Sequence, residues 1–264
     1  MNTGPVAAQA ILFMLTFLTL SISGEPGRRF NEGRGISVTA HPRNVGSTGE
    51  LVSKLRFRIS LSLDGFAAGP NQSLQEPLGI GGEQLHEWVV PLEAWRRAHG
   101  KEGGEVNEST RVMEAELANI GATIMGRNMF GGGPGPWSTT DPWNGWWGRN
   151  PPFHHPVFVL THHARERLMM EGGTSFTFVT DGIESALEQA RRAAGGKDVA
   201  LAGGARAAQQ YLNAGLVDEM QLHLAPMLLG GGERLFDTVE DLHGLVLVET
   251  VATPNVVHLK FARK

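Results

Sequence analysis

Polar and apolar positions alternate over residues 55–63. The odd positions carry leucine, phenylalanine or isoleucine, and the even positions carry the polar residues Arg56, Arg58, Ser60 and Ser62. A period of two is typical of a strand that has one apolar and one polar face. Asp64-Gly65 follows as a turn dipeptide, so we expect the strand to end there. The polar side chains on the second face of this strand point either into a functional site or into water.

Helical patterns and short apolar runs alternate through the rest of the chain. Residues 107–120 carry apolar side chains at helical spacing, with Asn107 or Ser109 as a cap and Gly121 as a stop. Asp181 and Glu184 stand at capping-box spacing before a second helical pattern, and a third follows the Gly203-Gly204 pair and reaches Leu212. Strands are predicted for the short apolar runs at residues 122–125, 157–161, 176–180, 199–202 and 220–224.

The last two apolar runs, residues 245–251 and 256–262, are joined by the turn-forming residues 252–255. This arrangement predicts an antiparallel hairpin at the end of the chain. Strands that alternate with helices predict an α/β domain whose sheet is parallel in the middle. The sequence therefore indicates an α/β fold with an antiparallel edge.

The first fifty residues differ from the rest. Residues 5–23 form the most apolar run of the chain, and residues 24–49 are rich in Gly, Arg, Asn, Pro and Ser without apolar periodicity. The apolar run resembles a signal-peptide core that lacks a leading Lys or Arg, or a membrane span at the short limit. A third reading is that it is not part of the working protein. We expect residues 1–50 to be a disordered or non-native extension and residues 51–264 to form the domain.

Composition excludes several kinds of site. The chain of 264 residues has a formal net charge of −4 and no basic block, so an electrostatic footprint for nucleic acid is missing. It has no cysteine, which excludes disulfides, thiolate metal ligands and a cysteine nucleophile. The dinucleotide pattern GxGxxG and the P-loop pattern are both missing, which disfavours the folds that use them.

Glycine, hydroxyl and basic positions follow three of the predicted strands. Ligands of parallel sheets bind outside the carboxyl ends of the strands, so we expect these positions to meet in one site. A guanidinium, a hydroxyl and the free amides of a glycine-opened helix all favour an anion, and a phosphorylated nucleotide fits that set. The three motifs are Gly126-Arg127-Asn128, Thr161-His162-His163 and Gly203-Gly204-Ala205-Arg206.

Five segments resemble the dihydrofolate reductase superfamily in their order along the chain. They are SLDGFAAG, IMGRNMF, VFVLT, LAGGARAAQQYLNAGLVDE and LHLAPMLLGGGERLF. The resemblance is to the reductase domain at the carboxyl end of the bifunctional riboflavin-biosynthesis deaminase-reductase, and it covers roughly residues 54–262. It implies a dihydrofolate-reductase-like three-layer fold with a mostly parallel central sheet and an antiparallel C-terminal hairpin.

The resemblance also implies NADPH as the cofactor. In that superfamily the segment like GRNMF helps to hold the 2′-phosphate and pyrophosphate, the segment like VFVLT supports the adenosine side, and the glycine pair opens the helix under the pyrophosphate. The backbone near Ser60 and Ala67 is implied to lie by the nicotinamide. The implied cofactor-binding residues are Ser60, Ala67, Gly126, Arg127, Asn128, Thr161, Gly203, Gly204, Ala205 and Arg206.

The proton donor is not fixed by a motif. Candidates are Asp64 and three residues of the segment GGEQLHEWVV, namely Glu83, His86 and Glu87. Dihydrofolate reductases carry a carboxylate on a helix after the first strand, and Glu83 or Glu87 falls in a comparable region. Asp64 and Glu87 are taken as the candidate catalytic residues. Asp64 also suits a plain turn, and His86 also suits a packing role.

Residues 131–156 depart from the riboflavin enzymes, which have an acidic and Arg-bearing segment that binds a ribityl phosphate. Here the segment is rich in glycine and proline, and either walls a flat apolar substrate or packs a dimer interface. It contains Trp137, Trp143, Trp146 and Trp147. We expect no metal site, because ligand spacing is missing around His154, His155, His162 and His163.

The leading hypothesis is an NADPH-dependent reductase of a small heterocyclic substrate. Its substrate would be the ribosylaminopyrimidine of riboflavin synthesis, a dihydropterin or another carbonyl compound. A second hypothesis is a non-catalytic nucleotide-binding or dimeric protein that retains the cofactor cradle. By analogy with the family we expect a homodimer. Since NADPH is a cytosolic reductant, we expect a cytoplasmic protein, and a membrane reading of residues 5–23 conflicts with that cofactor.

Overall fold

The structure is a computed structural model that describes residues 53–98 and 101–264. The expectations for residues 1–50, including the apolar run 5–23, concern residues outside that part of the chain. Within the described ranges, no helix has the length and apolar character that crossing a membrane requires.

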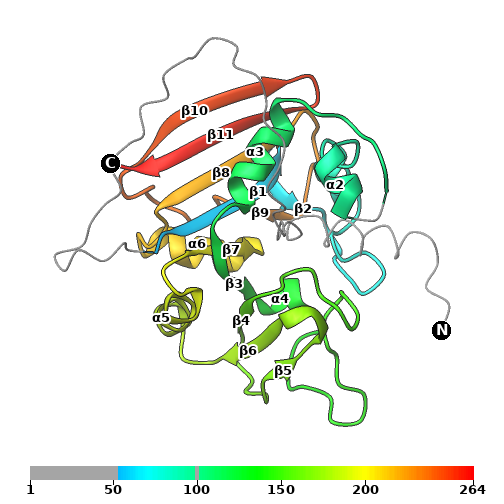
Figure 1. Cartoon of the computed structure of the whole chain (residues 1–264), viewed down its shortest axis with the longest axis vertical. Coiled ribbons are helices and arrows are strands. Elements are labelled where there is room, and N and C mark those ends of the chain that lie inside the picture. The colour runs from blue at the N-terminus through cyan, green and yellow to red at the C-terminus, as the bar shows by residue number, and fades with distance from the viewer. Residues whose placement is uncertain (1–52, 99–100) are drawn as a thin grey trace, which may run out of the picture.

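A nine-stranded sheet runs through the molecule in the order β10-β11-β8-β1-β7-β3-β4-β6-β5 (Figure 1). The strands from β8 to β6 pair in parallel, whereas β10, β11 and β5 pair antiparallel at the two edges. A short second sheet pairs β2 with β9. The predicted parallel centre and C-terminal hairpin are confirmed. The strands are β1 Leu55–Ser62, β2 Phe66–Ala68, β3 Ile120–Gly126, β4 Pro156–Leu160, β5 Leu168–Met169, β6 Ser175–Val179, β7 Asp198–Gly203, β8 Glu219–Ala225, β9 Glu233–Arg234, β10 Leu245–Thr253 and β11 Val256–Arg263.

Helices lie on both sides of the nine-stranded sheet and complete the three layers (Figure 1). The main core lies between the sheet and helices α5 and α6, whose apolar stripes are buried against it. The α-helices are α2 Glu93–Ala98, α3 Glu108–Leu117, α4 Arg127–Phe130, α5 Ile183–Ala194 and α6 Ala205–Asn213, and the 3-10 helices are η1 Gly82–His86 and η2 Glu171–Gly173.

Strand β1 presents the two faces that its alternating pattern predicts. Its apolar residues Leu55, Phe57 and Leu61 are buried in the main core. On the polar face, a guanidinium nitrogen of Arg58 lies 3.6 Å from the carboxylate of Glu116 on α3, and Ser60 accepts a hydrogen bond of 3.2 Å from an indole. The polar row of β1 therefore faces protein rather than open water.

Helix α3 begins as predicted and ends earlier. Asn107 is its N-cap and forms a reciprocal capping box with Thr110. The chain leaves the helix at Ala118, and Asn119 adopts a left-handed conformation with φ of 64°. Asparagine tolerates this region, so the helix stops before Gly121, the stop that the sequence suggested.

The start of helix α5 differs from the prediction. Gly182 is its N-cap, and no side chain caps the helix. Asp181 instead accepts a hydrogen bond from the hydroxyl of Thr180 at 3.2 Å. The capping box of Asp181 and Glu184 is therefore wrong, because the helix begins one residue later than that spacing assumes.

Buried polar side chains join α3 to the sheet. Ser60, His223 and His258 lie directly opposite one another on β1, β8 and β11. Oγ of Ser109 lies 2.9 Å from Nε2 of His258, whose Nδ1 lies 2.7 Å from Nδ1 of His223. Nε2 of His223 lies 3.1 Å from Oε1 of Glu116. Ser109 and Glu116, about two turns apart on α3, thus contact the sheet through two imidazoles.

The contact between two Nδ1 atoms restricts the charge of this network. One proton lies between them, so the ring that accepts it carries no proton on Nδ1 and is neutral. Burial, and next the nearby His223, lower the pKa of His258 to about 4. Burial raises the pKa of Glu116, but His223, Arg58 and His258 lower it by more. The network therefore combines an ionised carboxylate with at least one neutral imidazole.

The tryptophan-rich segment folds into a second apolar cluster. Trp146 and Trp147 are buried in it with Phe130, Phe153 and Phe176. Indole N–H groups also donate to backbone carbonyls of α4, which fixes the segment against that helix. These tryptophans serve packing within the chain.

We expect the free energy of unfolding to fall as the pH drops from about 6.5 to about 4. His258 has a pKa of about 4 in the folded chain and an ordinary value of 6.5 when unfolded, so the unfolded state binds more protons in this window. Stability therefore rises with pH there, by about 1.4 kcal/mol per pH unit for one such histidine. Urea unfolding at about pH 7, 5.5 and 4.5 measures this slope.

The variant His258→Gln removes this contribution and should lower the slope over the same window by about 1.4 kcal/mol per pH unit. His86 and His155, whose pKa values burial also lowers, continue to contribute. His243→Gln, which replaces a more exposed histidine, serves as the control and should keep the wild-type slope. Equal slopes for wild type and His258→Gln would contradict the assignment.

Candidate functional site

A pocket of about 510 Å³ lies at the carboxyl ends of the parallel strands, and we call it the strand-end pocket. It spans the sheet from β4, which leads into Thr161, across β3 and β7 to β1, which supplies Ser60. All three predicted strand-end motifs contribute to it. Gly203 does not line it but directly precedes Gly204. The predicted residues that line it are Ser60, Ala67, Gly126, Arg127, Asn128, Thr161, Gly204, Ala205 and Arg206.

The glycine pair leaves the start of α6 open. Gly203 has a φ of 106°, which favours glycine, and the peptide bond to Gly204 is cis. Gly204 is the N-cap of α6 and has an ordinary φ of −72°. A Cβ at either glycine would meet no atom within 4 Å. A helix start carries unpaired N–H groups and a partial positive charge, so this space suits an anion.

Arg127 places its cationic guanidinium at the same pocket. Its guanidinium donates to carbonyls of residues 131–133 at 2.9 to 3.3 Å, and lies 3.1 Å from the ring centroid of Trp137. Among the described residues, its buried Nη1 finds no acceptor, and no carboxylate pairs with it or with Arg165. Burial, and next the nearby Arg165, lower the pKa of Arg127 to about 10. An anion would satisfy both the orphaned N–H and the two adjacent cations.

The remaining predicted residues sit around the same pocket. Thr161 is buried, and its Oγ1 accepts a hydrogen bond of 3.2 Å from the N–H of His163. Arg206, in the first turn of α6, lies 3.3 Å from the carboxylate of Glu233. Asn128 is exposed on α4. The structure thus brings the predicted cofactor residues together.

The two predicted catalytic carboxylates do not line this pocket. Asp64 accepts hydrogen bonds from the backbone N–H groups of Leu229 and Gly230, at 3.1 and 2.7 Å. A hydrogen bond with Ser62 and these backbone bonds lower the pKa of Asp64 to about 2. Glu87 is exposed after η1. Asp64 holds a turn just after β1, and neither carboxylate lines the strand-end pocket.

The four histidines near β4 divide into two pairs. His162 and His163 line the strand-end pocket. Nδ1 of His154 lies 2.8 Å from a backbone carbonyl, and Nε2 of His155 lies 2.7 Å from the hydroxyl of Thr123. In the part of the chain that the structure describes, no group of three or more His, Asp or Glu side chains could hold a metal ion.

The pocket continues beyond Ser60 and Ala67 to a region that we call its β1 end. Arg58, Gln72 and His86 line it there. His86 is the last residue of η1 and is buried, and burial, followed by His223, lowers its pKa to about 3. Burial lowers the pKa of Arg58, and the nearby Glu116 opposes that shift. Sequence reasoning weighed His86 but missed Arg58, whose signal was its place in the polar row of β1.

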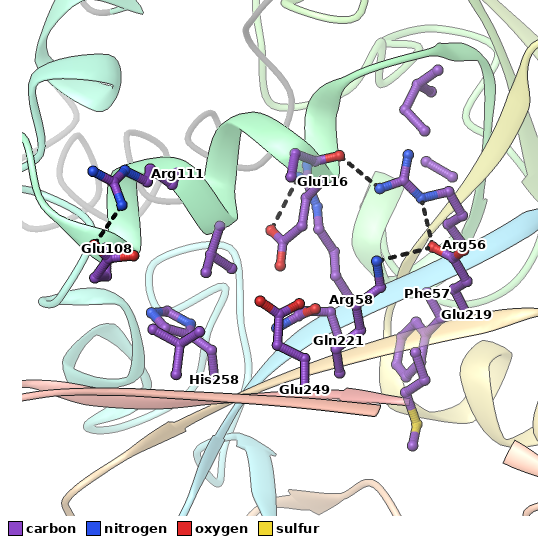
Figure 2. Close-up of a pocket in the computed structure, with 17 residues that line it drawn as sticks. Arg56, Phe57, Arg58, Glu108, Arg111, Glu116, Glu219, Gln221, Glu249 and His258 are labelled. Atoms are coloured by element: carbon purple, nitrogen blue, oxygen red, sulfur yellow. Dashed lines mark hydrogen bonds and ion pairs between the residues drawn. The ribbon is translucent and has the colours of Figure 1, made fainter. Parts of the chain in front are cut away.

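A second cleft, of about 280 Å³, lies between α3 and the strands β1, β8, β10 and β11 (Figure 2). Figure 2 shows Glu116 reaching from α3 toward the strands. The charged side chains that line this cleft are mostly paired with one another, so the cleft carries no excess charge of one sign. The pairs are Arg58 with Glu116 at 3.6 Å, Arg111 with Glu108 at 2.7 Å, and Arg56 and Lys260 with Glu219 at 3.5 and 3.7 Å.

Comparison with known proteins matches residues 53–259 to the family described as the RibD C-terminal domain. The uncharacterized protein YyaP of Bacillus subtilis (strain 168) is 30% identical over 105 residues, which are 38% of this chain and 55% of the relative. The match thus spans about half the length of that curated relative.

One solved structure agrees on the fold, and two others superpose less well. A protein of Shewanella sp. PV-4, provisionally named for riboflavin biosynthesis, superposes with a TM-score of 0.51 at 20% identity, over 80% of this chain and 99% of that chain. A deaminase/5-amino-6-(5-phosphoribosylamino)uracil reductase of Thermotoga maritima gives 0.47 at 12% identity, over 80% and 57% of the two chains. The dihydrofolate reductase of Enterococcus faecalis gives 0.45 at 13% identity, over 80% and 96%.

The family match covers nearly all of the described chain, and the sheet has the parallel centre and antiparallel edge that the resemblance implied. The chain belongs to the RibD C-terminal domain family.

Proposed function

We propose that this chain is an NADPH-dependent reductase of a small heterocyclic substrate, resembling the 5-amino-6-(5-phosphoribosylamino)uracil reductase of riboflavin biosynthesis. The observation that carries the proposal is the convergence of Arg127, Thr161 and the open start of α6 on one pocket. The same pocket reaches Ser60 and Ala67 on β1 and β2. A long pocket with anion-binding groups at strand ends suits an extended dinucleotide.

The residues present fit the phosphates of such a cofactor. Arginines 58, 127 and 206 line the strand-end pocket, against one carboxylate, that of Glu233. The open space above Gly203 and Gly204 would take the pyrophosphate, and the orphaned Nη1 of Arg127 would bind the ribose 2′-phosphate. When bound, the reduced nicotinamide supplies the hydride for the reduction.

The β1 end supports a small, flat substrate with polar edges. Arg58, Gln72 and His86 offer hydrogen bonds there, and Leu78 adds an apolar contact. A pyrimidine or a dihydropterin has such edges. We place the reaction in the cytoplasm, where NADPH is the reductant, and propose that the enzyme is a homodimer.

The second candidate is a nucleotide-binding protein without catalysis. One observation favours it: within the described residues, neither Asp64 nor Glu87 lines the pocket, and Glu233 is already paired with Arg206. Binding and turnover must therefore be tested separately.

The variant Arg127→Ala should weaken NADPH binding by about 1 to 3 kcal/mol, the range for a hydrogen bond to a charged group, and leave NADH binding nearly unchanged. Only NADPH carries the 2′-phosphate. Isothermal titration calorimetry is the right measurement, because Arg127 lies against Trp137 and its loss would itself change the protein fluorescence.

Arg192→Ala, which removes an exposed arginine of α5, is the matched control and should leave both affinities unchanged. Equal losses for NADPH and NADH in Arg127→Ala would remove the role in binding the 2′-phosphate.

The variant Gly204→Asp should reduce the affinity for both NADPH and NADH at least tenfold, about 1.4 kcal/mol. Gly204 has an ordinary φ and open space around a Cβ, so a side chain fits there without backbone strain. A carboxylate at the helix start would repel the pyrophosphate and bind the amides itself. Gly204→Asn has the same shape without the charge, so it isolates electrostatics from bulk. Equal effects of Asp and Asn would show that charge at this position is irrelevant.

Turnover separates the two candidate functions. We expect the wild type to oxidise NADPH with at least one compound from a panel of 5-amino-6-(5-phosphoribosylamino)uracil, 7,8-dihydrofolate and 4-nitrobenzaldehyde. The nicotinamide absorbance, together with product formation in equal amount, measures this. Tight NADPH binding with no oxidation by any member would instead favour the nucleotide-binding protein.

A further inference from the structure

The β1 end of the strand-end pocket holds one imidazole among the described residues. His86 lines the pocket together with Ser60 and Ala67, the positions proposed to lie by the nicotinamide. The other imidazoles that line the pocket, His162 and His163, follow β4 at the far side of the sheet. His86 is therefore placed where a substrate beside the nicotinamide would be.

Carboxylates do not compete with His86 for this role. Asp64 is engaged by the backbone of Leu229 and Gly230, and Glu87 is exposed outside the pocket. Glu233 lines the pocket but lies 3.3 Å from Arg206 at the start of α6.

Resting on the proposed reductase function, we propose that His86 is the catalytic hydrogen-bond donor of this site. The N–H of its neutral imidazole binds the heteroatom of the substrate's C=N or C=O bond. As the carbon of that bond accepts the hydride, the π electron pair moves onto the nitrogen or oxygen, and His86 stabilises the developing negative charge. A proton from water then forms the new N–H or O–H bond and leaves hydroxide. His86 keeps its own proton, as a neutral imidazole can when it polarises a carbonyl.

The surroundings of His86 favour the neutral ring. The helix η1 packs against β1, β2 and β8. Arg58 on β1 lines the same pocket as His86, and His223 on β8 acts electrostatically on the His86 ring. Glu116 on α3 and His258 on β11 lie behind His223 and contact it. Burial first, and then His223, keep the pKa of His86 near 3. An imidazolium at this place would add a buried positive charge to a pocket that Arg58 also lines.

The position of His86 is fixed by its neighbours in the chain. It ends the helix η1, which packs against β1, β2 and β8. Two residues later, the indole of Trp88 donates to Ser60 at 3.2 Å and lies 4.8 Å from the ring of His223. Donors that are held rigidly stabilise charge better, because they need no reorganisation during the reaction.

Two substitutions distinguish a donor from a proton-giving acid. His86→Leu removes every N–H and should reduce kcat at least about 100-fold, as the loss of one such donor does in other enzymes. His86→Gln retains an N–H donor that cannot act as an acid, and should lose only about tenfold. His155→Gln is the control, because it removes another imidazole, partly buried, that does not line the pocket. Calorimetry should show NADPH affinity within about twofold of wild type for all three.

A second readout does not depend on activity. In protein labelled with ¹⁵N-histidine, the His86 signals, assigned by their absence from His86→Leu, should show a neutral ring from about pH 5 to pH 8, with and without NADP⁺. Wild-type kcat should be independent of pH over the same range.

Three results would overturn the proposal: wild-type kcat in His86→Leu, equal losses in His86→Leu and His86→Gln, or a His86 ring that titrates near pH 6.5. Failure of the proposed function looks different, since wild type would then bind no NADPH or oxidise none with the panel. If NADPH binds but is not oxidised, the spectra and a titration of the NADP⁺ complex with 7,8-dihydrofolate decide the matter. If no NADPH binds, the spectra and the same titration of the free protein decide it. An unshifted His86 signal on saturation would reject the role, and a shifted neutral signal would support it.

Discussion

The polar face of strand β1 has to be buried without losing its hydrogen bonds. This constraint determines which residues the layer on that face of the sheet must supply. β1 lies between parallel partners on both sides, and its apolar face is committed to the core under α5 and α6. Buried polar groups that lack partners are costly. The opposite layer therefore supplies partners, with Glu116 from α3 beside Arg58 and the indole of Trp88 on Ser60. The strand that fills the core thus also forms a wall of the pocket.

The strand-end pocket combines open space at the start of α6 with a cation held in a fixed orientation, and this combination suits an anion. The glycine pair leaves room above α6, whereas Arg127 is held by carbonyls of residues 131–133 and by the face of Trp137. Three carbonyl contacts do not neutralise a guanidinium, but they hold it in one orientation. The cation remains available and is already oriented. Such pre-organisation reduces the entropy lost on binding.

Much of the fold was predictable because its signals are local. The alternation of β1, the C-terminal hairpin and the glycine-opened start of α6 each follow from a few adjacent residues, and parallel strands bring their carboxyl ends to one edge. Local signals failed at helix ends. Asn119 took the left-handed position ahead of Gly121, and Gly182 rather than Asp181 became the N-cap of α5.

The buried polar network between α3 and the sheet could not be predicted from such local signals. Ser109 and Glu116 meet His223 and His258 only through the packing of α3 on β8 and β11, more than 100 residues away in the chain. A hint existed, since His223 and His258 occupy polar positions of alternating strands. The position of the candidate carboxylates outside the pocket has a related reason. The sequence shows that Asp64 is near the first strand, but only the structure shows that backbone N–H groups of residues 229 and 230 engage it.

An uncharged donor at the β1 end is consistent with the electrostatics of the whole pocket. Its arginines, at 58, 127 and 206, are suited to a cofactor with several negative charges. An ionised carboxylate close to the nicotinamide would weaken that field, and an added imidazolium would be a further buried cation in a pocket that Arg58 also lines. A neutral imidazole avoids both costs and still presents an N–H. The polar layer under α3, which places His223 close to His86, therefore connects the packing of β1 to the protonation state that the proposed chemistry requires.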